Sequence, residues 1–171
     1  MKKKKNVTTT DIKPKFKYRY MEIAKIWAKN SYAKRQKVGA IIVKDGQIIS
    51  DGYNGTPTGF ENECETIEPC DATKENCTSL FGVQNCELCP YHKVKTKPYV
   101  LHAEANAILK VARSNNSTEG ATLFCTMSPC LECAKLIIQA GIIAVYYDIK
   151  YRDEEGIQLL ERAGILCKQL L

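Results

Sequence analysis

A regular alternation of helical and extended segments in the C-terminal part of the chain constrains its fold most. Apolar residues recur there at helical spacing or form short β-branched runs. The pattern predicts helices at 102–113, 129–140 and 154–163 and strands at 121–126, 142–148 and 165–169. This order is typical of right-handed crossovers between parallel strands. We therefore expect an α/β domain built on a largely parallel sheet.

The N-terminal part adds an antiparallel element to this sheet. A helix is expected at 18–35, where apolar residues recur at helical spacing. The β-branched runs at 38–43 and 47–54 flank a Lys-Asp-Gly turn, which is typical of a hairpin. The prediction is an α/β fold with a mixed sheet of about five strands flanked by helices.

Chain length and charge distribution indicate one domain and no polymer partner. The 171 residues correspond to one ordinary domain, which we place at 18–171 behind a basic flexible tail at 1–17. The net charge of +6 resides in residues 1–19, which hold eight Lys or Arg and one acid. The remaining chain has 17 basic and 18 acidic residues, so no charge excess is available for binding nucleic acid.

No apolar run approaches the ~20 residues that cross a bilayer, and no apolar segment follows the basic start. We expect a cytoplasmic protein without membrane contact. In such a reducing compartment, nine Cys are expected to bind metal or do chemistry rather than form disulfides.

Two short motifs at predicted helix starts carry the chemistry. His102 and Glu104 open one helix, and Cys130 and Cys133 open the next behind a Pro. One His and two Cys are suitable ligands for a zinc ion that keeps a fourth position for water. His102 and Glu104 can share such a site only at a helix N-terminus, because two-residue spacing separates them inside a helix.

The residue types at the two motifs suit separate roles in a hydrolytic reaction. Zinc would lower the pKa of a bound water, and Glu104, which is not a ligand, would transfer the proton. This pattern is that of the zinc nucleobase deaminases. A lone His or a lone Cys-x-x-Cys is usually structural, but the conjunction of both motifs favours catalysis.

Four segments of the chain carry a family resemblance: KVGAIIV, DGYNGTPTGF, PYVLHAEANAI and MSPCLECAKLIIQAGI. They resemble the deoxycytidylate (dCMP) deaminases of the zinc-dependent cytidine deaminase superfamily. The resemblance covers about residues 18–165 apart from the Cys-rich insert. It implies a three-layer cytidine deaminase-like fold and deamination of dCMP to dUMP for thymidylate synthesis. It also implies zinc on His102, Cys130 and Cys133, with Glu104 as the proton shuttle.

The resemblance further implies how the substrate and effectors are bound. Asn54 matches a substrate-contacting Asn of the family, although on sequence alone it is equally well a turn residue. Family members are commonly homohexamers that dCTP activates and dTTP inhibits, with the loop at 52–59 near the effector site. Lys150 and Tyr151 follow a strand at the edge where both zinc motifs lie, so they are candidates for binding the 5′-phosphate. Their alternatives are a solvated charge and a packing residue.

The insert at 61–98 shows no sustained period and is expected to be irregular. It carries six candidate zinc ligands, Cys64, Cys70, Cys77, Cys86, Cys89 and His92. Of these, Cys86 and Cys89 have the spacing of a zinc knuckle. A second, structural zinc would staple the loop, and some phage-type members resemble this chain in carrying one. The alternative is a loop with free thiols.

Two other functions compete with dCMP deamination. A tRNA adenosine deaminase shares the zinc chemistry but needs a polymer-binding surface. A non-catalytic, zinc-stabilised interaction protein would not need Glu104.

Overall fold

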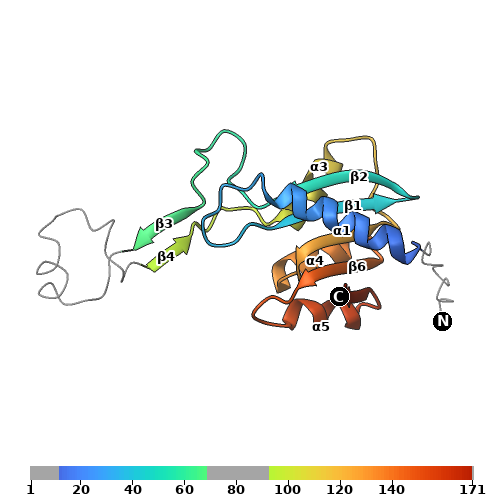
Figure 1. Cartoon of the computed structure of the whole chain (residues 1–171). Helices are drawn as coiled ribbons and strands as arrows, with labels where there is room; N and C mark the ends of the chain where they lie inside the picture. The colour runs from blue at the N-terminus through green and yellow to red at the C-terminus, as the bar shows by residue number, and fades with distance from the viewer. Residues whose placement is uncertain (1–11, 69–92, 171) are drawn as a thin grey trace, which may run out of the picture.

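A five-stranded mixed sheet organises residues 12–68 and 93–170, which are the residues that the computed structural model describes (Figure 1). The strands lie in the order β2-β1-β5-β6-β7. Their bounds are β1 Gly39–Lys44, β2 Gln47–Tyr53, β5 Thr122–Met127, β6 Ala144–Ile149 and β7 Leu166–Gln169. β1 is antiparallel to β2 and β5, whereas β5, β6 and β7 are mutually parallel. The predicted mixed sheet is confirmed.

Helices cover both faces of this sheet. α1 (Pro14–Ala28) packs on one face, and α3 (Ala103–Ala112), α4 (Leu131–Gln139) and α5 (Glu155–Arg162) pack on the other. Alternate strand residues serve the two layers, since Phe124 packs with α1 while its neighbours Leu123 and Cys125 join the other core. All three side chains are fully buried. The three-layer α/β fold is therefore confirmed.

The first helix begins four residues earlier than predicted and ends well before the predicted end. α1 begins at Pro14, where proline suits the first helical turn, so residues 14–17 are not part of a flexible tail. It ends at Ala28 rather than at 35. The reason is the buried Ser31, whose hydroxyl accepts the Ala33 N–H and donates to the Asn54 carbonyl, which draws the backbone out of the helix. Residues 1–11 lie outside the described residues.

The base of the insert is a strand pair, which corrects the expectation of an irregular segment. β3 (Glu65–Glu68) and β4 (Lys93–Thr96) form a separate antiparallel ribbon that projects from the sheet (Figure 1). Each strand has only four residues, which is too short for alternation to be recognised in the sequence. Residues 69–92 lie outside the described residues.

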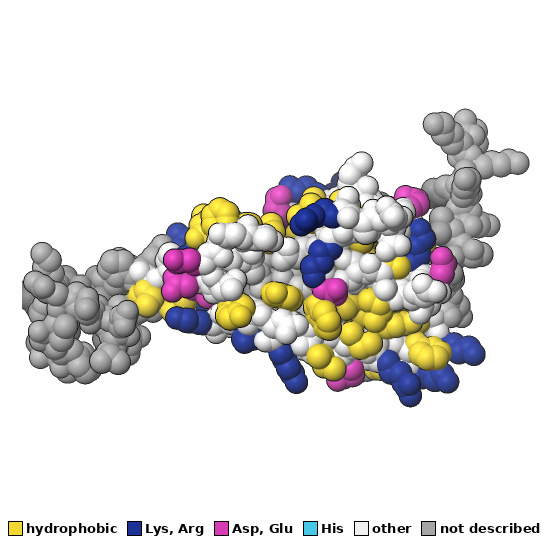
Figure 2. Space-filling model, turned by 90° about the horizontal axis from the view of Figure 1, so that it is seen from above, with side chains coloured by type: hydrophobic (Ala, Val, Ile, Leu, Met, Phe, Trp, Pro, Cys, Tyr) yellow, Lys and Arg dark blue, Asp and Glu magenta, His cyan; other side chains and the backbone are white. Residues whose placement is uncertain are grey.

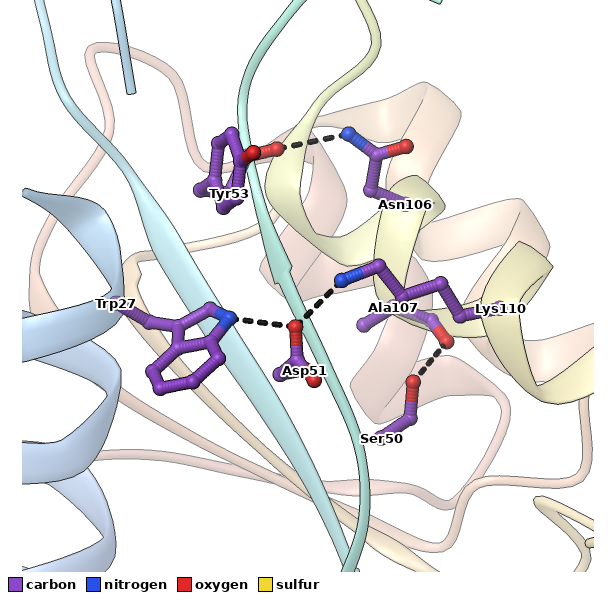
Figure 3. A network of polar contacts seen from close by, with 7 residues as sticks. All are labelled: Trp27, Ser50, Asp51, Tyr53, Asn106, Ala107 and Lys110. Carbon is purple, nitrogen blue, oxygen red and sulfur yellow. Dashed lines mark hydrogen bonds and ion pairs between the residues drawn. The ribbon is translucent and has the colours of Figure 1, made fainter. Parts of the chain in front are cut away.

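Polar contacts fasten the edge strand β2 to the helices on both faces (Figure 3). Asp51 Oδ1 accepts hydrogen bonds from the Trp27 indole of α1 and from the Lys110 ammonium of α3. Two more bonds join β2 to α3, from Ser50 Oγ to the Ala107 carbonyl at 2.7 Å and from Asn106 Nδ2 to the Tyr53 carbonyl at 2.8 Å. The end of β2 is thus held in a fixed position, directly before Asn54.

Within the described ranges, no helix combines the length and the apolar character that crossing a membrane requires.

Candidate active site

Three strand ends and two helix starts meet at one edge of the sheet. β2, β5 and β6 point the same way and end there, because β1 runs antiparallel between β2 and β5. A bridge between Gly55 and Leu101 brings the start of α3 to the end of β2. His102 and Cys130 are the N-cap residues of α3 and α4, both with extended backbone. The two motifs therefore cap helices at the carboxyl edge, as predicted.

His102, Cys130 and Cys133 form a compact cluster whose geometry fits zinc. Their ligand atoms all lie within 4.8 Å of one another. His102 Nδ1 is 3.4 Å from Cys130 Sγ and 3.3 Å from Cys133 Sγ. Typical zinc-nitrogen and zinc-sulfur bonds at a tetrahedral angle would separate these atoms by about 3.5 Å. Among residues 12–68 and 93–170, no other group of three His, Cys, Asp or Glu gathers in this way.

The two thiols of this cluster have opposite pKa shifts. Hydrogen bonding from the Cys133 thiol, assisted by His102, lowers the pKa of Cys130 to about 3. The same interaction with Cys130, together with burial, raises the pKa of Cys133. The pair thus favours one thiolate and one shared proton. Zinc would displace that proton, since it binds Cys as thiolate.

Glu104 lies directly beside the cluster. It is the second residue of α3, and only 4% of its surface is exposed. Burial raises the pKa of its carboxyl, and a backbone N–H, the charge of His102 and a hydrogen bond with Cys133 oppose this shift. A buried carboxyl that contacts a metal ligand is well placed to transfer a proton at the metal site.

A cavity of about 640 Å³ opens above this cluster. His102, Glu104 and Cys130 are among its lining residues. The predicted substrate contacts Asn54, Lys150 and Tyr151 line it too. The structure therefore brings all the residues assigned to catalysis and substrate binding to one cavity.

Each predicted substrate residue also has a partner within the protein. Asn54 Oδ1 accepts the Val38 N–H and Nδ2 donates to the Gln36 carbonyl, both at 2.8 Å. Asn54 thus holds the loop before β1, and one amide N–H remains for a ligand. Lys150 Nζ pairs with Glu154 Oε1 at 2.7 Å in an exposed position, so its charge is partly neutralised before any phosphate binds.

Sequence reasoning missed several polar residues of the cavity. They include three cations, Arg35, Lys95 and Arg152, and two further residues, Glu65 and Ser128. The sequence did contain one signal for Arg35, which shortly precedes β1. Because β1 was expected to be antiparallel to β2, its amino end lies at the same sheet edge as the carboxyl end of β2, where the zinc motifs lie. Lys95 and Glu65 belong to the ribbon, whose strands were not predicted.

A second cavity of about 480 Å³ lies next to the loop that follows β2. Gly55, Thr56 and Thr58 of the predicted effector loop line it, together with Lys110 and Arg113 of the α3 region. Its polar lining also includes Asn106, which fixes the end of β2 (Figure 3).

Little of the predicted second zinc site lies in the described residues. Cys86 and Cys89 fall within 69–92 and are therefore outside them. Cys64, another candidate ligand, is 2% exposed and lines the second cavity. Burial raises the pKa of its thiol.

The comparisons with known proteins agree with this geometry. Residues 14–149 match the family described as the cytidine and deoxycytidylate deaminase zinc-binding region. The chain is 37% identical over 163 residues to the deoxycytidylate deaminase of enterobacteria phage T4, covering 85% of this chain and 84% of that protein. The human deoxycytidylate deaminase is 36% identical over 159 residues, with coverages of 89% and 78%.

A solved structure is similar over nearly its whole length. The dCMP deaminase of cyanophage S-TIM5, in complex with dCMP and dUMP, has a TM-score of 0.75 and 40% identity. The match covers 93% of this chain and 99% of that one.

A His-Cys-Cys cluster with a buried Glu at the carboxyl edge of a mixed sheet defines the class of zinc-dependent hydrolytic deaminases. The chain belongs to the cytidine and deoxycytidylate deaminase family.

Proposed function

We propose that this chain hydrolyses dCMP to dUMP and ammonia and so supplies dUMP for thymidylate synthesis. The observation that carries the proposal is the His102, Cys130 and Cys133 cluster beside the buried Glu104, at a cavity lined by cations. The phage T4, human and cyanophage relatives, all named for this activity, support it.

Glu104 is the proton shuttle in this proposal, and His102, Cys130 and Cys133 hold the zinc ion. When bound, zinc makes a water molecule acidic enough to supply hydroxide near neutral pH. The Glu104 carboxylate would accept one proton of the attacking water and pass it to ring N3, and would then carry the second water proton to the amino group that leaves C4. One C–O bond forms, one C–N bond breaks, and water is consumed as ammonia departs.

The polar lining of the cavity accounts for recognition of a nucleoside monophosphate. The free N–H of Asn54 Nδ2 is available to contact the substrate. Lys150, Arg35, Lys95 and Arg152 give the cavity cationic side chains and Tyr151 adds a phenol, a combination that suits a 5′-phosphate.

The decisive experiment measures ammonia release by zinc-loaded protein from dCMP, from deoxycytidine and from a tRNA stem-loop. We expect dCMP to be the best substrate. A preference for the stem-loop would favour tRNA adenosine deamination instead, and bound zinc without turnover would favour a non-catalytic interaction protein. The charge of the chain beyond residue 19, with 17 basic and 18 acidic residues, speaks against a polymer substrate.

Regulation by dCTP and dTTP belongs to the same proposal. The second cavity supports it, because Lys110 and Arg113 there could pair with phosphates beside the loop at 55–58. Ammonia release from dCMP with and without each effector tests it. We expect dCTP to lower the KM and dTTP to raise it.

We further propose a homo-oligomer, a hexamer by resemblance, located in the cytoplasm. Hydrophobic side chains gather beside charged ones on the face shown in Figure 2, and the exposed large apolar residues include Tyr32, Phe60 and Leu109. Light scattering of the purified protein measures the assembly.

A second, structural zinc on Cys86 and Cys89 completes the proposal.

A further inference from the structure

Ser128 lies between the end of β5 and the zinc motif, and two hydrogen bonds tie it to the last residue of β6 and to the segment that follows. Its N–H donates to the Ile149 carbonyl at 2.8 Å. Its Oγ accepts the Tyr151 N–H at 2.7 Å. Only 2% of Ser128 is exposed. The two bonds therefore bracket Lys150 and fix the backbone that carries it.

The Ser128 hydroxyl replaces an acceptor of the parallel strand ladder. Met127 pairs with Ile149, and the bond from Ser128 N–H continues that ladder by one step. The next regular bond would run from the Tyr151 N–H to the Ser128 carbonyl. The hydroxyl accepts it instead, so the backbone of β5 is released to turn into Pro129 while β6 keeps its connection.

A second contact fixes the other end of the same segment. A Cβ atom on Gly156 would overlap the Pro129 carbonyl oxygen and the Cys130 backbone. The start of α5 thus packs directly on the backbone of a zinc ligand. The segment 150–155 is held at both ends by residues 128–130, next to the catalytic cluster.

This segment carries three residues that line the substrate cavity, Lys150, Tyr151 and Arg152. The Arg152 guanidinium lies 5.4 Å from the centre of the Tyr151 ring, so these side chains are arranged together. Their distance from the zinc cluster depends on the backbone connection at Ser128.

We propose that Ser128 is a positioning residue for substrate selection. This inference rests on the proposed function. The Ser128 hydroxyl sets the separation between the zinc cluster and the Lys150–Arg152 segment. That separation must match the distance from the cytosine ring of dCMP to its 5′-phosphate. Ser128 thereby determines the preference for a nucleoside monophosphate over the nucleoside.

The test compares Ser128→Ala with wild type on dCMP and deoxycytidine. We expect the ratio of kcat/KM for the two substrates to fall by about tenfold, mainly through the KM for dCMP. Zinc per chain should stay at the wild-type value. Ser128→Thr keeps the hydroxyl and should restore the ratio to within about threefold of wild type.

Thr126→Val is the matched control. Thr126 is a buried residue of β5 whose hydroxyl accepts the Gly39 N–H, so this variant loses a comparable bond that leads to β1 and not to the 150–155 segment. Its substrate ratio should equal that of wild type. A ratio that falls equally in both variants would overturn the proposal.

The remaining outcomes separate this inference from the proposed function. If wild type releases no ammonia from dCMP, the proposed function fails, and calorimetry with dUMP and deoxyuridine tests Ser128 without turnover. Ser128→Ala should then weaken dUMP binding by about tenfold more than deoxyuridine binding. An unchanged preference, or loss of folding or zinc in Ser128→Ala, would overturn the positioning role.

Discussion

Two parts of the cavity lining are attached to the protein in different ways. The core wall, formed by Ser128 and the segment 150–152, continues from parallel strands and is clamped on the zinc motif. The ribbon wall, formed by residues 35–36 and by Glu65, Lys95 and Thr96, comes from a loop and from the separate β3–β4 ribbon.

The contacts of the ribbon wall are weaker than those of the core wall. Glu65 Oε1 accepts the backbone N–H groups of Lys34 and Arg35 at 3.0 and 3.3 Å in an exposed position. Exposed hydrogen bonds contribute less to positioning than buried ones because water competes for the same groups. If the proposed function holds, we expect the sheet edge to fix the chemistry and the main phosphate contact, and the ribbon to adjust affinity.

The largest effect on turnover is expected at Glu104, which belongs to neither wall. Glu104→Gln should keep the zinc but lower kcat on dCMP and deoxycytidine alike by about a hundredfold to ten-thousandfold, because only proton transfer is removed. Steady-state kinetics with zinc analysis measures this. Cys130→Ala is the contrasting variant and should lose both metal and activity. Turnover within tenfold of wild type in Glu104→Gln would remove Glu104 from the mechanism.

The next effect is specific to the core wall. The double variant Lys150→Ala, Tyr151→Phe should reduce the preference for dCMP over deoxycytidine by about tenfold to a few hundredfold, the contribution of a charge-assisted phosphate contact. Lys135→Ala is a suitable control, since Lys135 also pairs with a nearby Glu on a helix but does not line the cavity. An unchanged ratio in the double variant would place the phosphate on other residues.

The zinc site and two residues of the core wall, Lys150 and Tyr151, follow from local sequence patterns. Cys130 and Cys133 open a helix that directly follows a buried strand, and Lys150 and Tyr151 follow the next strand, so chain order alone places them at one sheet edge. The role of Ser128 did not follow, because a hydroxyl that replaces a ladder carbonyl depends on the exact register of β5 and β6.

The ribbon wall could not be predicted for a different physical reason. Glu65 and Thr96 pair across the ribbon although about thirty residues separate them, and neither strand is long enough to show a period. The early end of α1 was missed similarly, because the Ser31 hydroxyl that ends it bonds to Asn54, far along the chain. Contacts between distant segments decide both features.

A smaller effect, on the KM for dCMP, is expected when the hydrogen bonds that hold the ribbon wall are removed. Glu65→Ala removes the acceptor for Lys34 and Arg35 and should raise the KM for dCMP by about twofold to tenfold with little change in kcat. Glu63→Ala is the control, since Glu63 pairs with Lys97 near the ribbon but does not line the cavity. A loss in Glu65→Ala as large as in the Lys150 and Tyr151 double variant would contradict the weaker role of this wall.

The smallest effect on turnover should come from the Cys-rich segment that connects the two ribbon strands. Wild-type protein should contain about two zinc ions per chain, and Cys86→Ser with Cys89→Ser should contain one, because a knuckle that loses two thiolates no longer holds its metal. Turnover of dCMP should stay within about threefold of wild type, since no catalytic ligand changes. Cys167→Ser, a change on strand β7 outside the candidate ligands, should leave the metal content at two.

A metal content near one in zinc-replete wild-type protein would mean that the insert thiols are free. A large loss of turnover in the double variant would instead mean that the insert acts on the zinc edge itself, and the distinction between the two walls would then fail.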